Sequence, residues 1–114
     1  MTALSDIDRS PDVIARTWHG WAPHATAGDY ERHYETAVSE HLRDVPGFCG
    51  ARLLRRTDGA DVEFTSIVYF ADMASVHAFA GDDPSRAVVE PAARRALTRW
   101  DERVDHHEVA VMLD

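Results

Sequence analysis

The chain has 114 residues, of which 45% are hydrophobic and 28% charged, and its formal net charge is −8 at pH 7. These values are typical of one soluble globular domain, and the acidic balance argues against nucleic-acid binding, which calls for a basic surface. The single cysteine, Cys49, excludes an internal disulfide. The sequence also has no lysine, asparagine or glutamine, which excludes a Schiff-base lysine and any side-chain amide donor from its chemistry.

Residues 13–21 predict a strand, because β-branched and aromatic residues alternate along this stretch. One face of the strand carries Arg16 and Trp18, and we expect this face to meet the helices. A buried guanidinium needs a partner, such as the carboxylate of Glu90 or the phenolate of a ligand. The indole N–H of Trp18 needs an acceptor, which a ligand oxygen could supply; the alternative is that Trp18 packs in an ordinary core.

A helix is predicted from about residue 26 to residue 44, where a proline–glycine turn ends it. Helical spacing places Tyr30, Tyr34 and His41 on one stripe of this helix. His41 is the candidate general base, because imidazole titrates near neutral pH. The alternative is a partly buried histidine that bonds a backbone carbonyl. His33, at the edge of the stripe, is a weaker candidate.

Two further strands are predicted over residues 48–57 and 62–70, and the Asp-Gly pair between them is a hairpin signal. Asp72 is expected to cap a short helix over residues 73–80, which ends at Gly81. A helical turn at Asp83-Pro84 follows. A second helix is then predicted from Pro91 to about Trp100, and a last strand over residues 104–113.

This β-α-β-β-α-β order predicts an α+β fold of the ferredoxin-like type, with a four-stranded antiparallel sheet and helices on one face. The opposite face would be an exposed apolar patch, so a homodimer that covers it is expected. We expect residues 1–12 to be a flexible N-terminal segment and residues 13–114 to be a single domain. Residues 1–12 lack a basic-then-apolar pattern, so neither a signal peptide nor a membrane span is expected. One cysteine suits a reducing cytoplasm.

The histidines do not have the spacing of a metal site. His106 and His107 are adjacent, and adjacent side chains on a strand point to opposite faces. None of the seven histidines forms a His-x-x-x-His or His-x-His pair. We therefore predict no metal.

The aromatic residues predict a cavity walled by flat rings, which suits a flat apolar ligand, although an ordinary core has the same composition. The residues expected to line it are Trp18, Tyr30, Phe64, Phe70, Phe79 and Trp100.

The stretch from Phe79 to Val109, FAGDDPSRAVVEPAARRALTRWDERVDHHEV, places a short helix, a Gly-Asp-Asp-Pro break, an amphipathic helix and a closing strand in close succession. Together with the strands before it, this layout resembles the antibiotic biosynthesis monooxygenase family of small dimeric α+β barrels. The sequence departs from the family pattern at Phe70, where a tryptophan is common, and at Ala92-Ala93, where relatives carry an acidic pair.

The resemblance implies a homodimeric monooxygenase that oxidises an aromatic polyketide or polyphenol with molecular oxygen, without metal or tightly held cofactor. A variant of this chemistry uses diffusible reduced flavin from a partner reductase. In this interpretation His41 is the base, and Tyr34 and Arg16 stabilise the substrate anion. Two alternatives stay open: a non-catalytic ligand-binding or accessory dimer, and a cofactor-free cyclase or isomerase on the same fold.

Overall fold

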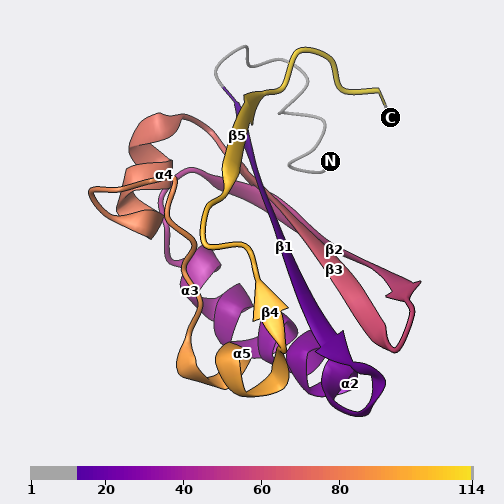
Figure 1. The fold of residues 1–114 in the computed structure, drawn as a ribbon. Helices are drawn as coiled ribbons and strands as arrows, with labels where there is room; N and C mark the ends of the chain where they lie inside the picture. The colour runs from indigo at the N-terminus through magenta and orange to yellow at the C-terminus, as the bar shows by residue number, and fades with distance from the viewer. Residues whose placement is uncertain (1–12, 114) are drawn as a thin grey trace.

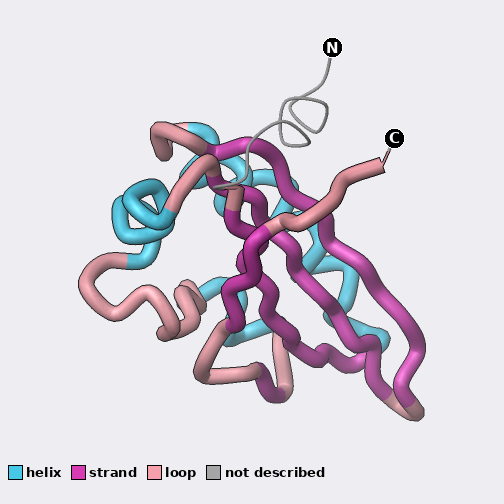
Figure 2. The backbone as a smooth tube through the Cα atoms, turned by 90° about the horizontal axis from the view of Figure 1, so that it is seen from above, coloured by secondary structure: helices cyan, strands magenta, loops and turns pink. Residues whose placement is uncertain are grey.

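A computed structural model describes residues 13–113, and the segment expected to be flexible, residues 1–12, lies outside the described residues. The long strands are β1 (Ile14–Pro23), β2 (Phe48–Asp58) and β3 (Asp61–Phe70), and the sheet order is β2-β3-β1-β4 with β5 also paired to β1. Every pairing is antiparallel. All helices lie on one face of this sheet, as Figures 1 and 2 show. The ferredoxin-like α+β arrangement predicted from the sequence is confirmed.

The central hairpin and its alternation follow the sequence closely. β2 and β3 meet at the pair Asp58–Asp61, and Gly59 takes φ 61° in the turn, a conformation that glycine adopts without strain. Along β3, buried and half-buried residues alternate strictly. The same alternation on β1 turns Arg16 and Trp18 toward the helices, the face expected for them.

The long helix is interrupted by a π-helical turn. It consists of α2 (His24–His33), η1 (Tyr34–Val38, the π-helix) and α3 (Ser39–Arg43), so it begins two residues before the predicted start. A π-helix has more residues per turn than an α-helix, so it shifts every later residue around the axis. After Tyr30, the residues that face the sheet therefore recur every four positions. Leu42 belongs to this stripe and is 1% exposed.

The C-terminal third differs from the sequence prediction in three places. The helix α5 (Pro91–Ala96) ends four residues early, because residues 99–100 form β4 (Arg99–Trp100), which pairs with Trp21 and Gly20 on the edge of β1. This pairing satisfies backbone groups of β1 that a longer helix would leave unpaired. The last strand, β5 (Asp105–Glu108), is shorter than predicted. Asp83 and Pro84 lie in a turn closed by Arg86 N–H and Asp83 O at 3.1 Å, not in a helical segment.

The short helix α4 (Met73–Ala80) has the predicted ends. The carboxylate of Asp72 accepts a hydrogen bond from the N–H of Ser75 at 2.9 Å, and Gly81 follows the helix with φ 85°. Asp72 is therefore the N-cap, which supplies an acceptor to an otherwise unpaired N–H.

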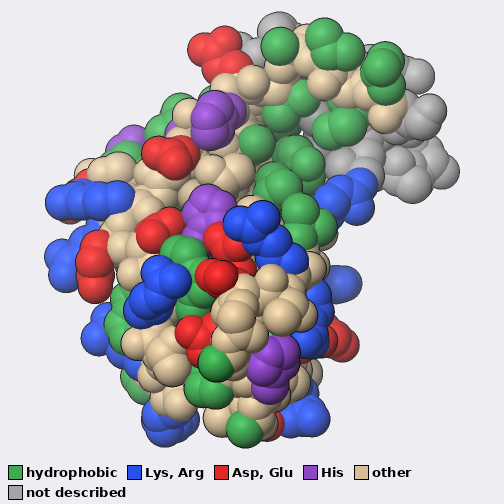
Figure 3. Space-filling model, turned by 45° about the vertical axis from the view of Figure 1, so that its right-hand side comes forward, with side chains coloured by type: hydrophobic (Ala, Val, Ile, Leu, Met, Phe, Trp, Pro, Cys, Tyr) green, Lys and Arg blue, Asp and Glu red, His purple; other side chains and the backbone are tan. Residues whose placement is uncertain are grey.

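Two hydrophobic clusters form the core. One lies under α2 and α5 around Tyr30 and Phe64, and the other lies under α3 and α4 around Leu42 and Phe70. Among the described residues, no helix has the length and apolar character needed to cross a membrane. On the face shown in Figure 3, acidic and basic side chains are interspersed and do not form a continuous basic patch.

Candidate functional site

A mostly apolar cavity lies between the helices and the sheet, at the junction of the two hydrophobic clusters. Its volume is about 60 Å³. The walls come from β1, β3, the helix α2–η1–α3, Phe79 of α4, the start of α5, and residues 88–90, which have no regular secondary structure. A water molecule needs roughly 10–15 Å³ of such space, so this form of the cavity holds a few waters.

Arg16 is the arginine of the cavity wall, and it is 4% exposed. Its guanidinium donates to the backbone carbonyls of Pro84 and, at 3.0 Å, Arg86. It also contacts Nε2 of His106 at 3.0 Å and lies over the ring of Phe79, 5.5 Å from its centre. Burial lowers the pKa of Arg16 to about 10, so the group stays charged at neutral pH. The expectation of Glu90 as its partner is wrong, because carbonyl oxygens take that place.

Trp18 lines the cavity, but its polar atom is turned away from any ligand. The indole N–H donates to the carbonyl of Asp101 at 2.8 Å. The suggestion that a ligand oxygen accepts this N–H is therefore wrong, because the segment after β4 supplies the acceptor. Trp18 contributes a ring surface to the cavity.

Two tyrosines and a serine form the middle of the cavity wall. The hydroxyl of Tyr34 lies 2.8 Å from the hydroxyl of Ser66 on β3. Burial raises the pKa of Tyr34, and the hydrogen bond with Ser66 opposes this shift. The pKa of Tyr30 is also raised, first by burial and then by its neighbour Tyr34. Both side chains are therefore neutral phenols at physiological pH, and a phenol can donate a hydrogen bond to an anion.

His33 is the histidine in the cavity wall. Its side chain is 11% exposed, and its Nε2 lies 3.7 Å from a carboxylate oxygen of Glu90. That nitrogen is buried, and within residues 13–113 it has no hydrogen-bond partner. A buried polar atom without a partner costs roughly 1–3 kcal/mol. An unpaired imidazole nitrogen next to an apolar cavity is therefore a feature that a ligand would relieve.

His41 is exposed and does not line the cavity, contrary to the helical stripe predicted for it. Its ring packs on the outside of Phe79, with centroids 5.0 Å apart. The cause is the π-helical turn, which turns Val38 and Leu42 toward the cavity in the places that a regular helix would give to Ala37 and His41. The sequence placed His33 at the edge of the stripe. It could not show that the next turn is π-helical and holds one more residue than an α-helical turn.

The other predicted lining residues divide between the cavity and the core. Tyr30 and Phe79 line the cavity. Phe64 and Phe70 are 0% exposed and belong to the two core clusters instead. Trp100 packs against the edge of the first cluster from β4, under the guanidinium of Arg94. These three side chains pack in or against the clusters beside the cavity and do not line it.

In the part of the chain that the structure describes, no three His, Cys, Asp or Glu side chains come together in a group that could hold a metal ion.

The fold has counterparts among solved structures. The chain is similar to SnoaB from Streptomyces nogalater, described as a cofactor-independent oxygenase, with a TM-score of 0.56 and 16% sequence identity over 84% of this chain and 89% of that one. An asparagine-to-alanine variant of SnoaB matches with a TM-score of 0.58 and 15% identity, over 90% of this chain and 96% of the variant. No family model matches the sequence. No curated protein matches it significantly either.

At this level of identity the likeness establishes the fold alone. The asparagine substituted in the SnoaB variant can have no identical counterpart here, because this chain contains no asparagine. The polar side chains available in the cavity are instead those of the arginine, histidine, tyrosine, serine and glutamate residues described above.

Proposed function

We propose that this protein is an oxygenase that removes a proton from an aromatic, phenol-like substrate in the cavity and lets the resulting anion react with molecular oxygen. The observation that carries the proposal is the buried, unpartnered Nε2 of His33 in the wall of a mostly apolar cavity. The similarity of fold to SnoaB, described as a cofactor-independent oxygenase, supports the same chemistry. An aromatic polyketide or polyphenol of antibiotic biosynthesis is the substrate class that fits.

The substrate itself can supply all the electrons for this reaction. An anthrone, for example, loses a proton from its CH₂ group, and the carbanion passes one electron to dioxygen. The two radicals combine to a peroxide, which loses water when the second C–H proton is removed. The CH₂ group becomes a carbonyl, one oxygen atom enters the product and the other leaves as water, so neither flavin nor metal is required.

In this scheme His33 accepts the proton and Glu90 stabilises the imidazolium that forms. Imidazole suits this task because its ordinary pKa lies near physiological pH. The hydroxyl of Tyr34, which lies 2.8 Å from Ser66, is placed to donate to the substrate anion. Trp18, Tyr30 and Phe79 supply ring surfaces for binding.

A cavity of about 60 Å³ must widen before a polycyclic substrate can enter. The wall most suited to this movement is residues 88–89, which precede Glu90. This stretch has no regular secondary structure, and Val88 is 42% exposed. We expect ligands of increasing ring number to bind by displacing this stretch, while the sheet and the long helix stay in place.

The test is oxygen consumption by purified protein with a panel of anthrones and hydroxylated naphthalenes, measured with chelator present and with or without NADH and a flavin reductase. Uptake without flavin that yields a product heavier by one oxygen and lighter by two hydrogens is the expected result. Uptake only with reduced flavin would replace the cofactor-free scheme by the flavin-dependent one. Ligand binding without uptake under any condition would overturn the oxygenase and favour a binding protein or cyclase.

The matched variants are His33→Ala and His41→Ala, because both histidines lie on the same long helix and only His33 faces the cavity. A general base contributes about 10²–10⁴-fold in rate, so His33→Ala should lose at least about a hundredfold in turnover, and His41→Ala should stay near wild type. Loss of turnover in His41→Ala alone would refute the assignment of the base.

We also propose a homodimer that buries the helix-free face of the sheet. Leu54, 50% exposed on the edge strand β2, is an apolar side chain that the helices leave uncovered. Trp21, on the outer face of β1, is partly covered by Arg99, whose guanidinium lies 3.7 Å from its ring centre. Light scattering of the eluting protein gives the mass directly, and a monomer at all concentrations would exclude the dimer.

A further inference from the structure

We propose that the cavity binds its aromatic ligand as an anion, with an anionic oxygen group of the ligand on the guanidinium of Arg16 and the acidic hydrogen facing His33. This inference rests on the proposed function and names the substrate class of the same site: a fused-ring aromatic compound with a carboxylate or phenolate at one end. The observations that carry it are the burial of Arg16 and the way its neighbours are paired.

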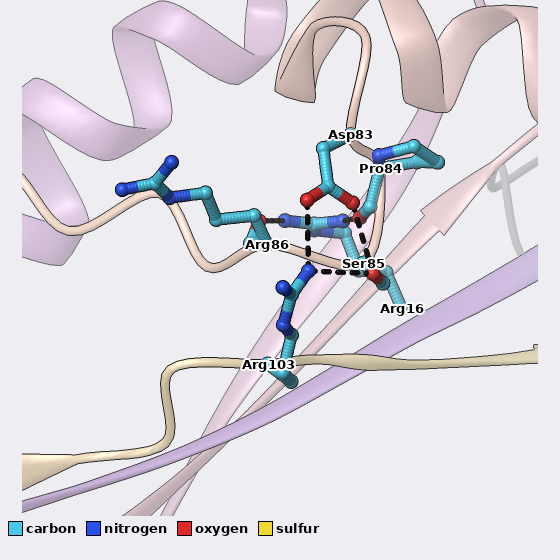
Figure 4. A network of polar contacts seen from close by, with 6 residues as sticks. All are labelled: Arg16, Asp83, Pro84, Ser85, Arg86 and Arg103. Carbon is cyan, nitrogen blue, oxygen red and sulfur yellow. Dashed lines mark hydrogen bonds and ion pairs between the residues drawn. The ribbon is translucent and has the colours of Figure 1, made fainter.

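Arg16 has no carboxylate of its own among residues 13–113, although an acidic residue lies nearby. Asp83 is committed to Arg103 at 2.8 Å and to the hydroxyl of Ser85 at 3.0 Å. Figure 4 shows this arrangement, in which the Arg16 guanidinium reaches the carbonyls of the turn while Asp83 points to Arg103. A buried cation whose contacts are carbonyl oxygens and an imidazole keeps its full charge uncompensated, which favours an anion beside it.

The hydrogen-bond count of Arg16 leaves donors for such an anion. A guanidinium has five N–H groups and no acceptor. Nη1 contacts the carbonyl of Pro84 and Nε2 of His106, and one N–H of Nη2 goes to the carbonyl of Arg86. Because arginine only donates, His106 must accept through Nε2 and is neutral in this contact. Two N–H groups, on Nε and Nη2, are not used by these contacts, and a carboxylate or phenolate can take them.

The positions of Arg16 and of the Tyr34–Ser66 hydroxyl pair along the strands favour one orientation of the ligand. Arg16 pairs in register with Val68 on β3, and Trp18, one step further along the same face, pairs with Ser66, which contacts Tyr34. The hydroxyl pair therefore lies beyond Arg16 on the side away from β5.

The carbonyl of Arg86 accepts from Arg16, and Glu90, four residues later, lies beside His33. Four residues of chain span at most about 14 Å, so Arg86 and Glu90 are no further apart than this. A bicyclic or tricyclic ring system is shorter than this upper limit. Proton transfer to His33 gives the ligand a second negative charge. The carboxylate or phenolate stays on Arg16, the new anion accepts a hydrogen bond from the hydroxyl of Tyr34, and the imidazolium of His33 lies beside Glu90.

The experiment compares naphthalene-2-carboxylate with naphthalene-2-carboxamide, which has the same shape and no charge. Binding to the full-length protein is followed by quenching of tryptophan fluorescence and checked by calorimetry. Charge-assisted hydrogen bonds are strong, so the wild-type protein should prefer the carboxylate by about tenfold or more. Equal affinity of the wild type for the two ligands would overturn the proposal without any variant.

Two variants separate ligand recognition from fastening of the turn. In Arg16→Gln, the ratio of the carboxylate affinity to the carboxamide affinity should fall close to one. The carboxamide affinity itself should stay within about threefold of the wild-type value. Arg86→Gln removes a nearby exposed charge and should keep the preference. If Arg16 only fastens the turn, Arg16→Gln will weaken both ligands equally, and that result would refute the proposal. Should Arg16→Gln not fold, the wild-type ratio still decides.

The outcome is separable from that of the oxygenase assay. Oxygen uptake with neutral phenols, together with no preference for the carboxylate, would retain the proposed function and reject the anionic substrate class. A clear carboxylate preference without any uptake would do the reverse.

Discussion

The pair of variants Leu42→Ala and His41→Ala tests most directly which side of the long helix faces the sheet after the π-helical turn. Leu42 is 1% exposed in the core cluster around Phe70, whereas His41 is exposed and only packs its ring on Phe79. Truncation of a buried leucine costs about 2–5 kcal/mol, because the transfer energy is lost and a cavity remains. Truncation of the exposed histidine should cost less than about 1 kcal/mol.

The assay is thermal and urea unfolding at one fixed protein concentration, since any oligomer would make the midpoint depend on concentration. For a chain of this length, 1 kcal/mol shifts Tm by roughly 4 °C, so Leu42→Ala should melt about 8–20 °C below wild type and His41→Ala within about 4 °C. A regular α-helix over the same residues predicts the reverse order, with His41 inside and Leu42 outside. Equal losses, or a larger loss for His41→Ala, would refute the shift by the π-helical turn and would return His41 to the cavity as a competing candidate for the base.

Three further predictions concern the frame of the cavity. Gly47→Ala should destabilise by more than about 2 kcal/mol in urea unfolding, because φ is 89° and an added Cβ would overlap the hydroxyl of Ser75. Tyr34→Phe should cost about 1–3 kcal/mol by leaving the buried hydroxyl of Ser66 without its partner, and the double variant with Ser66→Ala should recover part of the loss. The pKa of His106 is lowered from 6.5 by burial and by the neighbouring guanidinium, so the unfolded chain binds more protons below about pH 6.5. Stability should therefore fall as the pH drops through that value, and the fall should be shallower in His106→Gln.

The sequence predicts the sheet because the sheet depends on local patterns. The strand-forming residues over 48–57 and 62–70, the Asp-Gly turn and the Asp72 cap all act within a few residues, and the structure confirms the two strands, the turn and the cap. The end of α5 at Ala96 could not be read locally, because no proline or glycine marks it. It is set by the pairing of β4 with β1, a contact between segments about eighty residues apart.

The site was harder to predict than the fold for a related reason. Face parity on β1 correctly gave Arg16 and Trp18 as inward residues, because a strand has a period of two that admits no drift. In a helix, by contrast, a single π-helical turn changes which later residues face the sheet. Here it places Leu42 at the cavity, where a regular helix would place His41. The partners of the inward polar groups were equally out of reach, because they are backbone carbonyls, which side-chain patterns cannot reveal.

Those carbonyl partners explain how one small domain can have a cavity that is both closed and able to change. The turn after α4 is held to the sheet by the buried guanidinium of Arg16 and by its backbone bonds to the segment before β5, among them Ala87 N–H to Glu102 O at 2.9 Å. Residues 88–89 follow without such ladder bonds to the sheet, and Val88 is exposed. A ligand that displaces this stretch therefore breaks few hydrogen bonds, while the anchored turn keeps Arg16 in place to meet its charge.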